Sequence, residues 1–524
     1  MVRRARDWIA PLAVGALALG AARAALLPGL GFWDTAEFQT VAPLLGTAHP
    51  TGFPTYVLLG WLVSVLLQPL GEPAYLMNLF AAGSVAVAAA VTVDLVRALT
   101  RSTPLAVAAG IGLALTEIVW RIGTQADAHA LHLALLAILV RLLVAWEDRP
   151  RGASDRALVA AAIVFALAAG NHSLTLLLAP GIGLYVLAVD PGILRSPRRI
   201  AAPAIAVLVT LVAVYAQLPL RAGPFRAELV YGRPETWDGF WAVVLAEQFR
   251  GSVGSPFADP AGTLAGLATR ATTWFGPLAA LIPVGAIAAI LRRPRYALLS
   301  GVSLTITCLF AAGYANADID RYYLGPTLFA WTWLALLGAA VLDALGLGPD
   351  PDPEAFGADH DDAGAPAAPA RPSPGRSVVT AGVGLALAVG LLAPTVIAAP
   401  ARLDRVDRST DHAARRWVER TLAALAPDAV VVSWWSYSTP LWYAQRVEGQ
   451  RPDIAIVDDR TRLDEDLGSL TDVIDSHLPS RPVYVIRIDQ REIRMLEERY
   501  VLEPIAGTDA SSLTRVVARR DIAP

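Results

Sequence analysis

Long apolar runs separated by short polar turns make up most of the first 400 residues. A membrane-spanning helix needs about 17 to 25 consecutive, mainly apolar residues, and eleven stretches of the chain come close to that length. They lie near residues 8–28, 75–97, 103–120, 128–146, 157–170, 173–189, 200–219, 263–291, 296–314, 322–345 and 377–397. The pattern predicts a polytopic α-helical membrane protein with about eleven transmembrane helices.

One further apolar stretch, residues 56–71, is nearer in length to an interfacial helix than to a span. Short cytoplasmic loops are enriched in basic residues, so the arginine clusters test whether this stretch crosses. If it does not cross, all five clusters fall on one side of the membrane. We therefore expect a juxtamembrane helix in the first extracytoplasmic loop. The clusters placed in the cytoplasm are Arg3/Arg4/Arg6, Arg97/Arg101, Arg149/Arg151/Arg156, Arg195/Arg198/Arg199 and Arg292/Arg293/Arg295.

In the same topology, a set of polar residues lies on the extracytoplasmic side of the membrane or at its edge. The set consists of Asp34, Glu37, His49, Glu117, Asp127, His129, Asn171, His172, the loop 221–261, Asn316, Asp318, Asp320 and Arg321. Polar chemistry is therefore expected at one face of the membrane.

Hydropathy changes twice after residue 345, which ends the predicted transmembrane domain (1–345). Residues 346–376 are rich in Pro, Ala and Asp and predict a disordered cytoplasmic linker before the last span, 377–397. Residues 401–524 are less apolar and alternate between strand and helix patterns. The strands are expected at 429–434, 453–459 and 482–488, and the helices near 409–425, 439–447 and 465–477. This alternation predicts a soluble α/β domain on the extracytoplasmic side.

Composition agrees with a membrane protein, since 55% of the 524 residues are hydrophobic, 17% are charged and the mean hydropathy is +0.48. The net charge of -3 gives no basis for nucleic-acid binding. Cys308 is the single cysteine, which excludes a disulfide within the chain and a cysteine-based metal site. The basic start and first apolar run, without a convincing cleavage site, predict a retained signal anchor.

The stretch GFWDTAEFQTVAPLLGTAHPTGFPTY, residues 31–56, carries the first candidate chemistry. A carboxylate at the bilayer centre costs about 2.5 to 3.5 kcal/mol, so Asp34 and Glu37 are expected where the first helix meets water. In a helix they would share a face, with Asp34 near the helix N-terminus. The glycine and prolines of HPTGFP predict a fixed turn over a membrane-edge cavity. Two interpretations stay open here, a helix cap with solvated neighbours and a carboxylate base.

Other polar positions also have a structural interpretation. Glu117 and Asp127 fit interfacial solvation, and His129 and His132 fit packing on a helix face. The pair Asn171–His172 fits a polar helix end.

Five segments of the chain carry a family pattern. They are WDTAEFQTVAPLLGTAHPTGFPTYVLLG (33–60), YLMNLF (75–80), GNHSLTLLLAP (170–180), QLPLRAGPFRAELVYGRPETWDGFWAVVLAEQFRG (217–251) and DIDRYYLGP (318–326). Together they resemble the GT-C superfamily of membrane glycosyltransferases that use polyprenyl-phosphate sugars, and within it the multi-span protein O-mannosyltransferase-like family. D-x-x-E followed by A-H-P-x-G-F-P is the most specific combination. The resemblance covers roughly residues 30–330 and implies a GT-C-like fold.

The resemblance implies inverting transfer of a monosaccharide, with mannose as the expected sugar, from a polyprenyl-phosphate donor to a hydroxyl of a protein acceptor, or alternatively of a glycan. One carboxylate must take the proton of the attacking hydroxyl. Asp34 is the first choice as base, and Glu37 is the alternative base or an acceptor-positioning residue. Donor and acceptor binding is predicted for His49, Asn171, His172, Arg221, Arg233, Arg321 and Tyr322, with the arginines serving the lipid phosphate.

The resemblance demands no metal, so no cofactor is expected. A divalent cation is the alternative, held by Asp34, His49, Asp127, His129 and His172. Two other classes of protein compete with an enzyme, a transporter or flippase of a polar or lipid-linked substrate and a scaffold that binds a lipid-linked glycan without chemistry. Polar groups at one face, instead of at mid-membrane, argue against transport.

Overall fold

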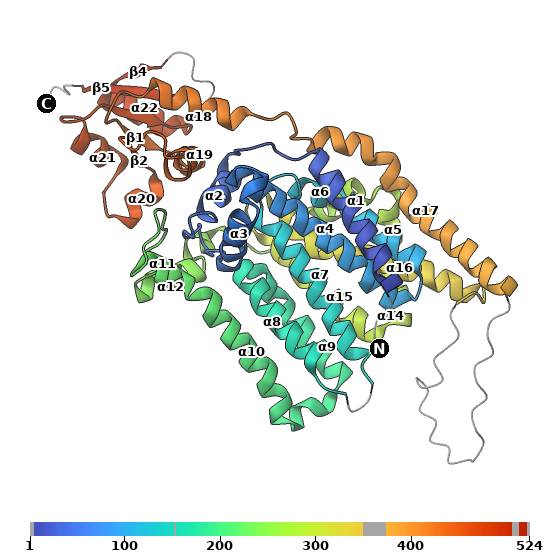
Figure 1. The fold of residues 1–524 in the computed structure, drawn as a ribbon. Helices are drawn as coiled ribbons and strands as arrows, with labels where there is room; N and C mark the ends of the chain where they lie inside the picture. Colours follow the sequence, from blue (N-terminus) through green and yellow to red (C-terminus); the bar gives the residue numbers. More distant parts are fainter. Residues whose placement is uncertain (1–4, 151–152, 349–373, 506–512, 521–524) are drawn as a thin grey trace.

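A bundle of apolar helices carries a smaller mixed sheet at one end (Figure 1). The computed structural model describes residues 5–150, 153–348, 374–505 and 513–520. The helices of the bundle are α1 (Ile9–Ala24), α2 (Trp33–Val41), α3 (Pro54–Leu66), α4 (Pro73–Thr100), α5 (Thr103–Ala114), α6 (Glu117–Ile122), α7 (Ala128–Glu147), α8 (Arg156–Asn171), α9 (Ala179–Val189), α10 (Pro197–Tyr215), α11 (Gln217–Ala222), α12 (Trp237–Val244), α13 (Pro260–Phe275), α14 (Ile282–Arg292), α15 (Pro294–Gly313), α16 (Leu324–Ala344) and α17 (Pro374–Val406).

Seven helical segments of the described chain are long and apolar enough to cross a membrane. They are Pro73–Thr100, Ala128–Glu147, Pro197–Ala222, Pro260–Arg292, Pro294–Gly313, Ile319–Ala344 and Val378–Val406, and each coincides with a predicted span. The other four predicted spans contain shorter helices, such as the 16 residues of α1 and the 12 residues of α5. The chain is thus a multi-pass membrane protein, whereas the count of eleven spans stays a prediction. The stretch 56–71 overlaps α3, a helix of only 13 residues that begins at Pro54.

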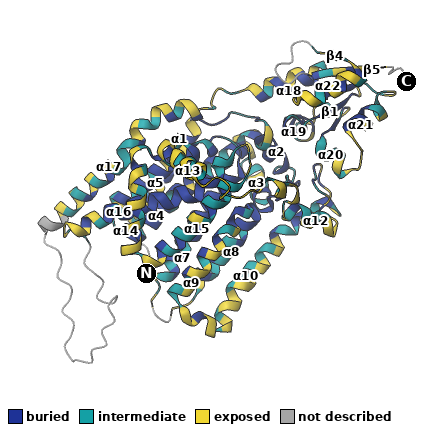
Figure 2. Cartoon of the chain, turned by 180° about the vertical axis from the view of Figure 1, so that it is seen from behind, coloured by how far each residue is buried: buried dark blue, intermediate teal, exposed yellow. Residues whose placement is uncertain are grey.

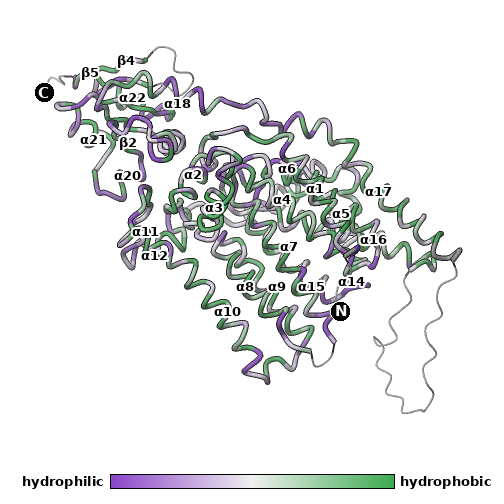
Figure 3. Tube along the Cα trace, in the orientation of Figure 1, coloured by the Kyte–Doolittle hydropathy of each residue, from purple (hydrophilic) through white to green (hydrophobic). Residues whose placement is uncertain are grey.

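Burial separates the inner helices of the bundle from the outer ones. Helices α4, α7 and α16 are mostly buried, while α10 and α17 lie at the outside and are largely exposed (Figure 2). The outer helices are nevertheless hydrophobic (Figure 3), and α10 exposes Ile205, Leu208, Val209 and Val212. Apolar surface of this extent is costly in water, so these helices are suited to face lipid.

The arginine clusters gather at one end of the bundle, called here the arginine-rich end. The contacts that join them are Arg97 to Asp7, Arg293 to Leu99, Arg295 to Glu147 and Arg199 to Asp155. The opposite end, called the acid-rich end, contains Asp34, Asp127 and Asp318. The 28-residue helix α4 separates the two, with Pro73 at the acid-rich end and Arg97 at the other. Arg3, Arg4, Arg151 and most of the predicted linker lie outside the described residues.

The C-terminal unit is a five-stranded sheet with strand order β2-β1-β3-β5-β4. Its elements are α18 (Ala413–Ala424), β1 (Val430–Ser433), α19 (Trp435–Trp442), β2 (Ala455–Val457), α20 (Asp459–Asp464), α21 (Leu470–His477), β3 (Val483–Ile486), α22 (Gln490–Arg499), β4 (Tyr500–Pro504) and β5 (Leu513–Arg519). Strand β1 pairs in parallel with β2 and β3, while β5 is antiparallel to β3 and β4. The three expected strands are therefore present, and β4 and β5 extend the sheet beyond them.

The predicted helix at 465–477 is wrong in its first half. The chain instead forms α20 and α21, because Asp466 and Gly468 adopt positive φ angles of 52° and 81° that interrupt a helix. Ser469 then starts α21 with a capping box that includes Asp472.

Aromatic packing joins the C-terminal unit to the acid-rich end. Phe32, just before α2, contacts the rings of Trp417 and Tyr437 at centroid distances of 5.7 and 6.1 Å. The backbone N–H of Ala74 donates to the hydroxyl of Tyr443 at 3.0 Å. The carboxyl ends of the parallel strands, where residue 434 follows β1, are consequently held against α2.

Candidate functional site

A cavity of about 950 Å³ lies between the acid-rich end and the C-terminal sheet. Its bundle wall includes Asp34, His49, His129, His172 and Arg321. The wall contributed by the C-terminal sheet, called here the roof, consists of Trp434, Trp435, Ser436, Asp459 and Arg460.

Asp34 lies in the first turn of α2 with one carboxylate oxygen fixed. Arg321 Nη1 and Nη2 each donate to Asp34 Oδ2 at 3.0 Å. No hydrogen bond to another described residue involves Oδ1, and the Asp34 side chain is 27% exposed. The carboxylate thus has a defined orientation and a free acceptor oxygen at the cavity.

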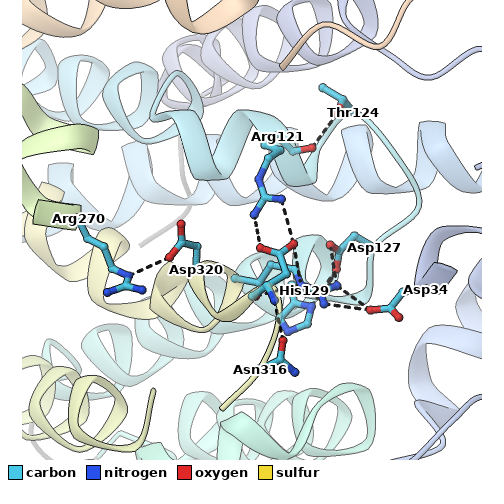
Figure 4. A network of polar contacts seen from close by, with 10 residues as sticks. Asp34, Arg121, Thr124, Asp127, His129, Arg270, Asn316 and Asp320 are labelled. Carbon is cyan, nitrogen blue, oxygen red and sulfur yellow. Dashed lines mark hydrogen bonds and ion pairs between the residues drawn. The ribbon is translucent and has the colours of Figure 1, made fainter. Parts of the chain in front are cut away.

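Arg321 is surrounded by carboxylates. Besides Asp34 it lies 3.5 Å from Asp127 Oδ2 and 3.3 Å from Asp318 Oδ2. Asp318 also accepts two hydrogen bonds of 2.9 and 2.6 Å from Arg121. Arg121, Asp127 and Asp34 of this network are labelled in Figure 4. Three carboxylates and two guanidinium groups therefore form one network without excess positive charge, and Asp34, Asp318 and Arg321 of this network line the cavity.

Asp127 caps α7 and holds the ring of His129. Its Oδ1 accepts from the His129 backbone N–H at 2.8 Å and lies 2.9 Å from His129 Nδ1. Burial opposes ionisation of Asp127, but His129 and Arg321 outweigh this effect and hold the pKa of Asp127 below its usual range. Asp127 is therefore a carboxylate that fixes the orientation of the imidazole.

His129 presents an unused nitrogen to the cavity. The residue is 4% exposed, and its Nε2 has no hydrogen-bond partner in the part of the chain that the structure describes. The ring lies 4.6 Å from that of His172 and 5.5 Å from that of Tyr322, both of which also line the cavity. Buried polar atoms normally have partners, so Nε2 marks a position for a ligand group.

Glu37 faces away from the cavity and binds His49. It is fully buried, and its Oε1 accepts from the His49 backbone N–H at 2.7 Å while Oε2 contacts His49 Nδ1. The expectation that Glu37 meets water is therefore wrong, because α2 turns this residue onto the following loop. Burial alone would lower the pKa of His49, but the Glu37 carboxylate raises it above the usual value.

The turn that carries His49 depends on two left-handed residues. Gly52 and Phe53 have φ angles of 82° and 47°, and Pro54 then begins α3. A Cβ atom at Gly52 would lie 3.2 Å from Leu218 and Val243, so both backbone conformation and space favour glycine. This local geometry explains the glycine and prolines of HPTGFP.

Five of the nine sequence-predicted site residues line the cavity, namely Asp34, His49, His172, Arg321 and Tyr322. Glu37 lies behind His49. Asn171 is buried, and its Nδ2 donates to the carbonyl of Ala128 at 2.9 Å, which ties α8 to α7.

The other two predicted arginines lie elsewhere. Arg221 donates to the carbonyls of Leu45 and Leu44 at 3.0 and 3.1 Å, and so supports the loop before His49. Arg233 lines a separate cavity of about 120 Å³ beside Asp464 of α20. The structure therefore places neither guanidinium in the wall that contains Asp34.

Two parts of the site escaped the sequence interpretation. Solvation is the expectation for Asp127 and packing for His129, with metal ligation as the alternative for both. An Asp two residues before a His at a helix start is, however, the pattern of a helix cap whose carboxylate also contacts the His ring. The roof residues Trp435 and Arg460 carry no sequence signal that relates them to α2. Their positions depend on how the sheet docks onto the bundle.

Among the described residues, no group of three or more His, Cys, Asp or Glu side chains is arranged to hold a metal ion. Asp34 and Asp127 contact Arg321, and His129 contacts Asp127. The five residues considered as metal ligands are thus engaged in ion pairs or ring contacts.

Part of the chain matches a known family. Residues 34–191 match the model described as "Protein O-mannosyl-transferase TMEM260 N-terminal domain". The Protein O-mannosyl-transferase TMEM260 of Mus musculus is 28% identical over 230 residues, which are 43% of this chain and 31% of that relative. The matched region therefore spans about a third of the relative's length.

Solved structures share the fold over nearly the whole chain. ArnT from Cupriavidus metallidurans bound to undecaprenyl phosphate has a TM-score of 0.60 at 15% identity, with coverage of 98% of this chain and 99% of that one. ArnT in the apo state has a TM-score of 0.59 at 14% identity, with 98% of each chain covered. These similarities confirm the resemblance to protein O-mannosyltransferases in sequence and show that the fold is shared with ArnT.

Proposed function

We propose that this chain is a membrane glycosyltransferase that moves a monosaccharide, mannose, from a polyprenyl-phosphate donor to a hydroxyl of a protein acceptor. The observation that carries the proposal is the carboxylate of Asp34, which stands in a large cavity with one oxygen held by Arg321 and the other free. The ArnT-like fold and the TMEM260 relative support the donor and acceptor classes.

In the proposed reaction Asp34 acts as a general base. Its free Oδ1 takes the proton of the acceptor hydroxyl as that oxygen attacks the anomeric carbon. The bond between the anomeric carbon and the phosphate oxygen breaks on the opposite side of the sugar, so the configuration inverts and polyprenyl phosphate leaves. General-base catalysis of this type contributes about 10²- to 10⁴-fold in rate, and Arg321 supplies the orientation that it needs.

Glu37 is better suited to position His49 than to act as base. Both of its oxygens contact His49, and the side chain is fully buried. A base must reach the proton that it removes, and Asp34 meets this requirement in the cavity whereas Glu37 does not.

Apolar side chains beside the polar wall suit a lipid donor. Leu176, Leu245 and Val253 line the cavity and are 56%, 53% and 52% exposed. A polyprenyl chain covering these side chains would remove apolar surface from water, at about 25 cal/mol per Å².

We assign the acid-rich end, the cavity and the C-terminal unit to the extracytoplasmic side. The support is the arginine-rich end, because basic residues in short loops favour the cytoplasmic side. The linker 346–376 would then be cytoplasmic.

The test is transfer of radiolabelled mannose from polyprenyl-phosphate-mannose to acceptors in membranes that contain the chain. Asp34→Asn should reduce labelling at least about 100-fold. Asp320→Asn is the matched control, because Asp320 pairs with Arg270 near the same end of the bundle without lining the cavity. Undiminished labelling in Asp34→Asn at equal expression would exclude this base. Movement of the lipid-linked substrate across sealed vesicles without covalent transfer would favour a transporter.

A further inference from the structure

The carboxyl ends of β1 and β2 open onto the same cavity as Asp34. Trp435 follows β1, and Asp459 and Arg460 follow β2; all three belong to the roof. The strand order β2-β1-β3 places the topological switch point of the sheet between β1 and β3. Ligands of open α/β sheets bind outside the carboxyl ends of the strands near such a point, and the roof residues that follow β1 and β2 lie at this edge of the sheet.

The turn that carries Arg460 is fixed on both sides. Asp458 Oδ1 accepts from the Thr461 N–H at 2.7 Å and from its hydroxyl at 2.8 Å. Arg487 Nη1 donates to both oxygens of Asp459 at 2.9 and 3.0 Å, and Arg487 itself is only 3% exposed. The backbone that carries Arg460 is therefore already ordered, so binding of a ligand by this side chain costs less conformational entropy.

The guanidinium of Arg460 is placed by an aromatic ring. It lies 5.3 Å from the centroid of Tyr231, a cation–π arrangement. Trp435 Nε1 donates to the Tyr231 hydroxyl at 2.9 Å and so fixes that ring from the roof. Trp435 also contacts the ring of His49 at a centroid distance of 5.7 Å, which brings the roof next to the bundle wall.

Arg460 differs from the other guanidinium groups of the cavity in its charge balance. Arg250, Arg321 and Arg408 form ion pairs with Glu247, Asp34 and Asp411, respectively. The neighbouring Asp459 is bound by Arg487. Within the described part of the chain, Arg460 is thus the cavity arginine without an ion pair, and its donors are available to an anion.

We propose that Arg460, together with the adjacent His49, binds the phosphate of the lipid donor. The inference rests on the proposed function, since transfer converts a phosphodiester into a monoester with additional negative charge. The network around Arg321 holds three carboxylates against two arginines, so that part of the bundle wall does not favour a phosphate, whereas His49 lies on the side nearer the roof. A guanidinium fork matches phosphate oxygens with two parallel hydrogen bonds, and the roof supplies one.

The experiment measures the affinity of the full chain in nanodiscs for undecaprenyl phosphate and for undecaprenol, which lacks the phosphate. Arg460→Ala should weaken binding of undecaprenyl phosphate about tenfold or more, because hydrogen bonds to charged groups are lost, and should leave undecaprenol binding unchanged. The affinity of Arg460→Lys for undecaprenyl phosphate should lie between those of the wild type and Arg460→Ala, because lysine keeps the positive charge but lacks the planar guanidinium. Arg491→Ala, at an exposed position of α22, is the matched control and should bind both lipids as the wild type does.

Three results would overturn the proposal. Equal losses for both lipids would assign Arg460 a structural role, and unchanged binding of both would remove it from the site. A raised KM for the acceptor with unchanged affinity for undecaprenyl phosphate would assign Arg460 to the acceptor. A chain that binds undecaprenyl phosphate through Arg460 but transfers no sugar would overturn the proposed function and leave this phosphate site standing.

Discussion

Arg321 donates two hydrogen bonds of 3.0 Å to the same oxygen of Asp34, although the two residues are 287 positions apart in the chain. The orientation of the proposed base is thereby set by the segment that leads into α16. The contact with Arg321 also explains why α2, a helix of only nine residues, can hold a carboxylate in a fixed position.

Arg321→Lys separates the charge of this contact from its geometry. Lysine keeps the positive charge near Asp34 and Asp127 but lacks the planar fork that holds one oxygen and leaves the other free. We expect kcat to fall about tenfold or more, since misplacement of a catalytic group by an ångström can cost up to about 100-fold, with little change in Tm. Equal kcat for the two proteins would show that the orientation of Asp34 does not depend on the fork.

Glu37→Gln should act on stability more than Asp34→Asn does. Glu37 is fully buried and forms an ion pair with His49, and breaking a buried pair by neutralising one partner costs about 3 to 5 kcal/mol. Asp34 is partly exposed, and an Asn there can still accept from Arg321. Thermal unfolding of both variants in one detergent checks the order of the two Tm values. A larger loss of Tm in Asp34→Asn would contradict the different roles assigned to the two acids.

The opening motif shows how far the sequence determines the site. Local rules predict a helix from the first carboxylate, a fixed turn at HPTGFP and a short helix after that turn. The structure has α2, the turn at Gly52 and α3 at these places. The different environments of Asp34 and Glu37 do not follow, because each depends on a distant contact. The helix places the two acids on neighbouring sides, and only the positions of Arg321 and the 47–53 loop decide which one meets the cavity.

The Glu37–His49 pair should make stability depend on pH. The pKa of His49 is raised in the folded protein, so the pair contributes its full stabilisation below about pH 6.5, the usual value for histidine. This contribution is lost as pH rises through the raised pKa. We expect Tm to fall over that interval in the wild type and less so in His49→Asn, and melting curves from pH 5.5 to 9 measure the difference. Parallel curves would mean that another group carries the dependence.

The C-terminal unit illustrates the opposite limit of sequence analysis. The hydrophobic runs of β1, β2 and β3 predict three strands correctly. The antiparallel strands β4 and β5 are harder to recognise, since their exposed positions break the apolar run. The docking of the sheet on α2 has no local signature, so the contribution of Trp435 and Arg460 to the cavity emerges only in three dimensions.

Arg221→Ala distinguishes a structural arginine from a phosphate-binding one. Arg221 donates to the carbonyls of Leu44 and Leu45, so its loss removes two hydrogen bonds from the loop before His49, while Gln217 still donates to Leu45. We expect the free energy of unfolding to fall by about 1 to 3 kcal/mol, which lowers Tm, and the affinity for undecaprenyl phosphate to stay unchanged. Weaker lipid binding at full stability would instead return Arg221 to the phosphate site.

His129 offers a test of whether its free nitrogen acts on the substrate. His129 lines the cavity, its Nδ1 contacts Asp127, and its buried Nε2 has no partner among the described residues. Glutamine can place an amide near the position of Nε2, whereas asparagine can reach only the position of Nδ1. We therefore expect His129→Asn to lower kcat/KM for sugar transfer about three- to tenfold, the effect of one lost hydrogen bond, and His129→Gln to retain most of the activity. Higher activity in His129→Asn than in His129→Gln, with matching Tm values, would mean that His129 acts through Nδ1 and serves only to position Asp127.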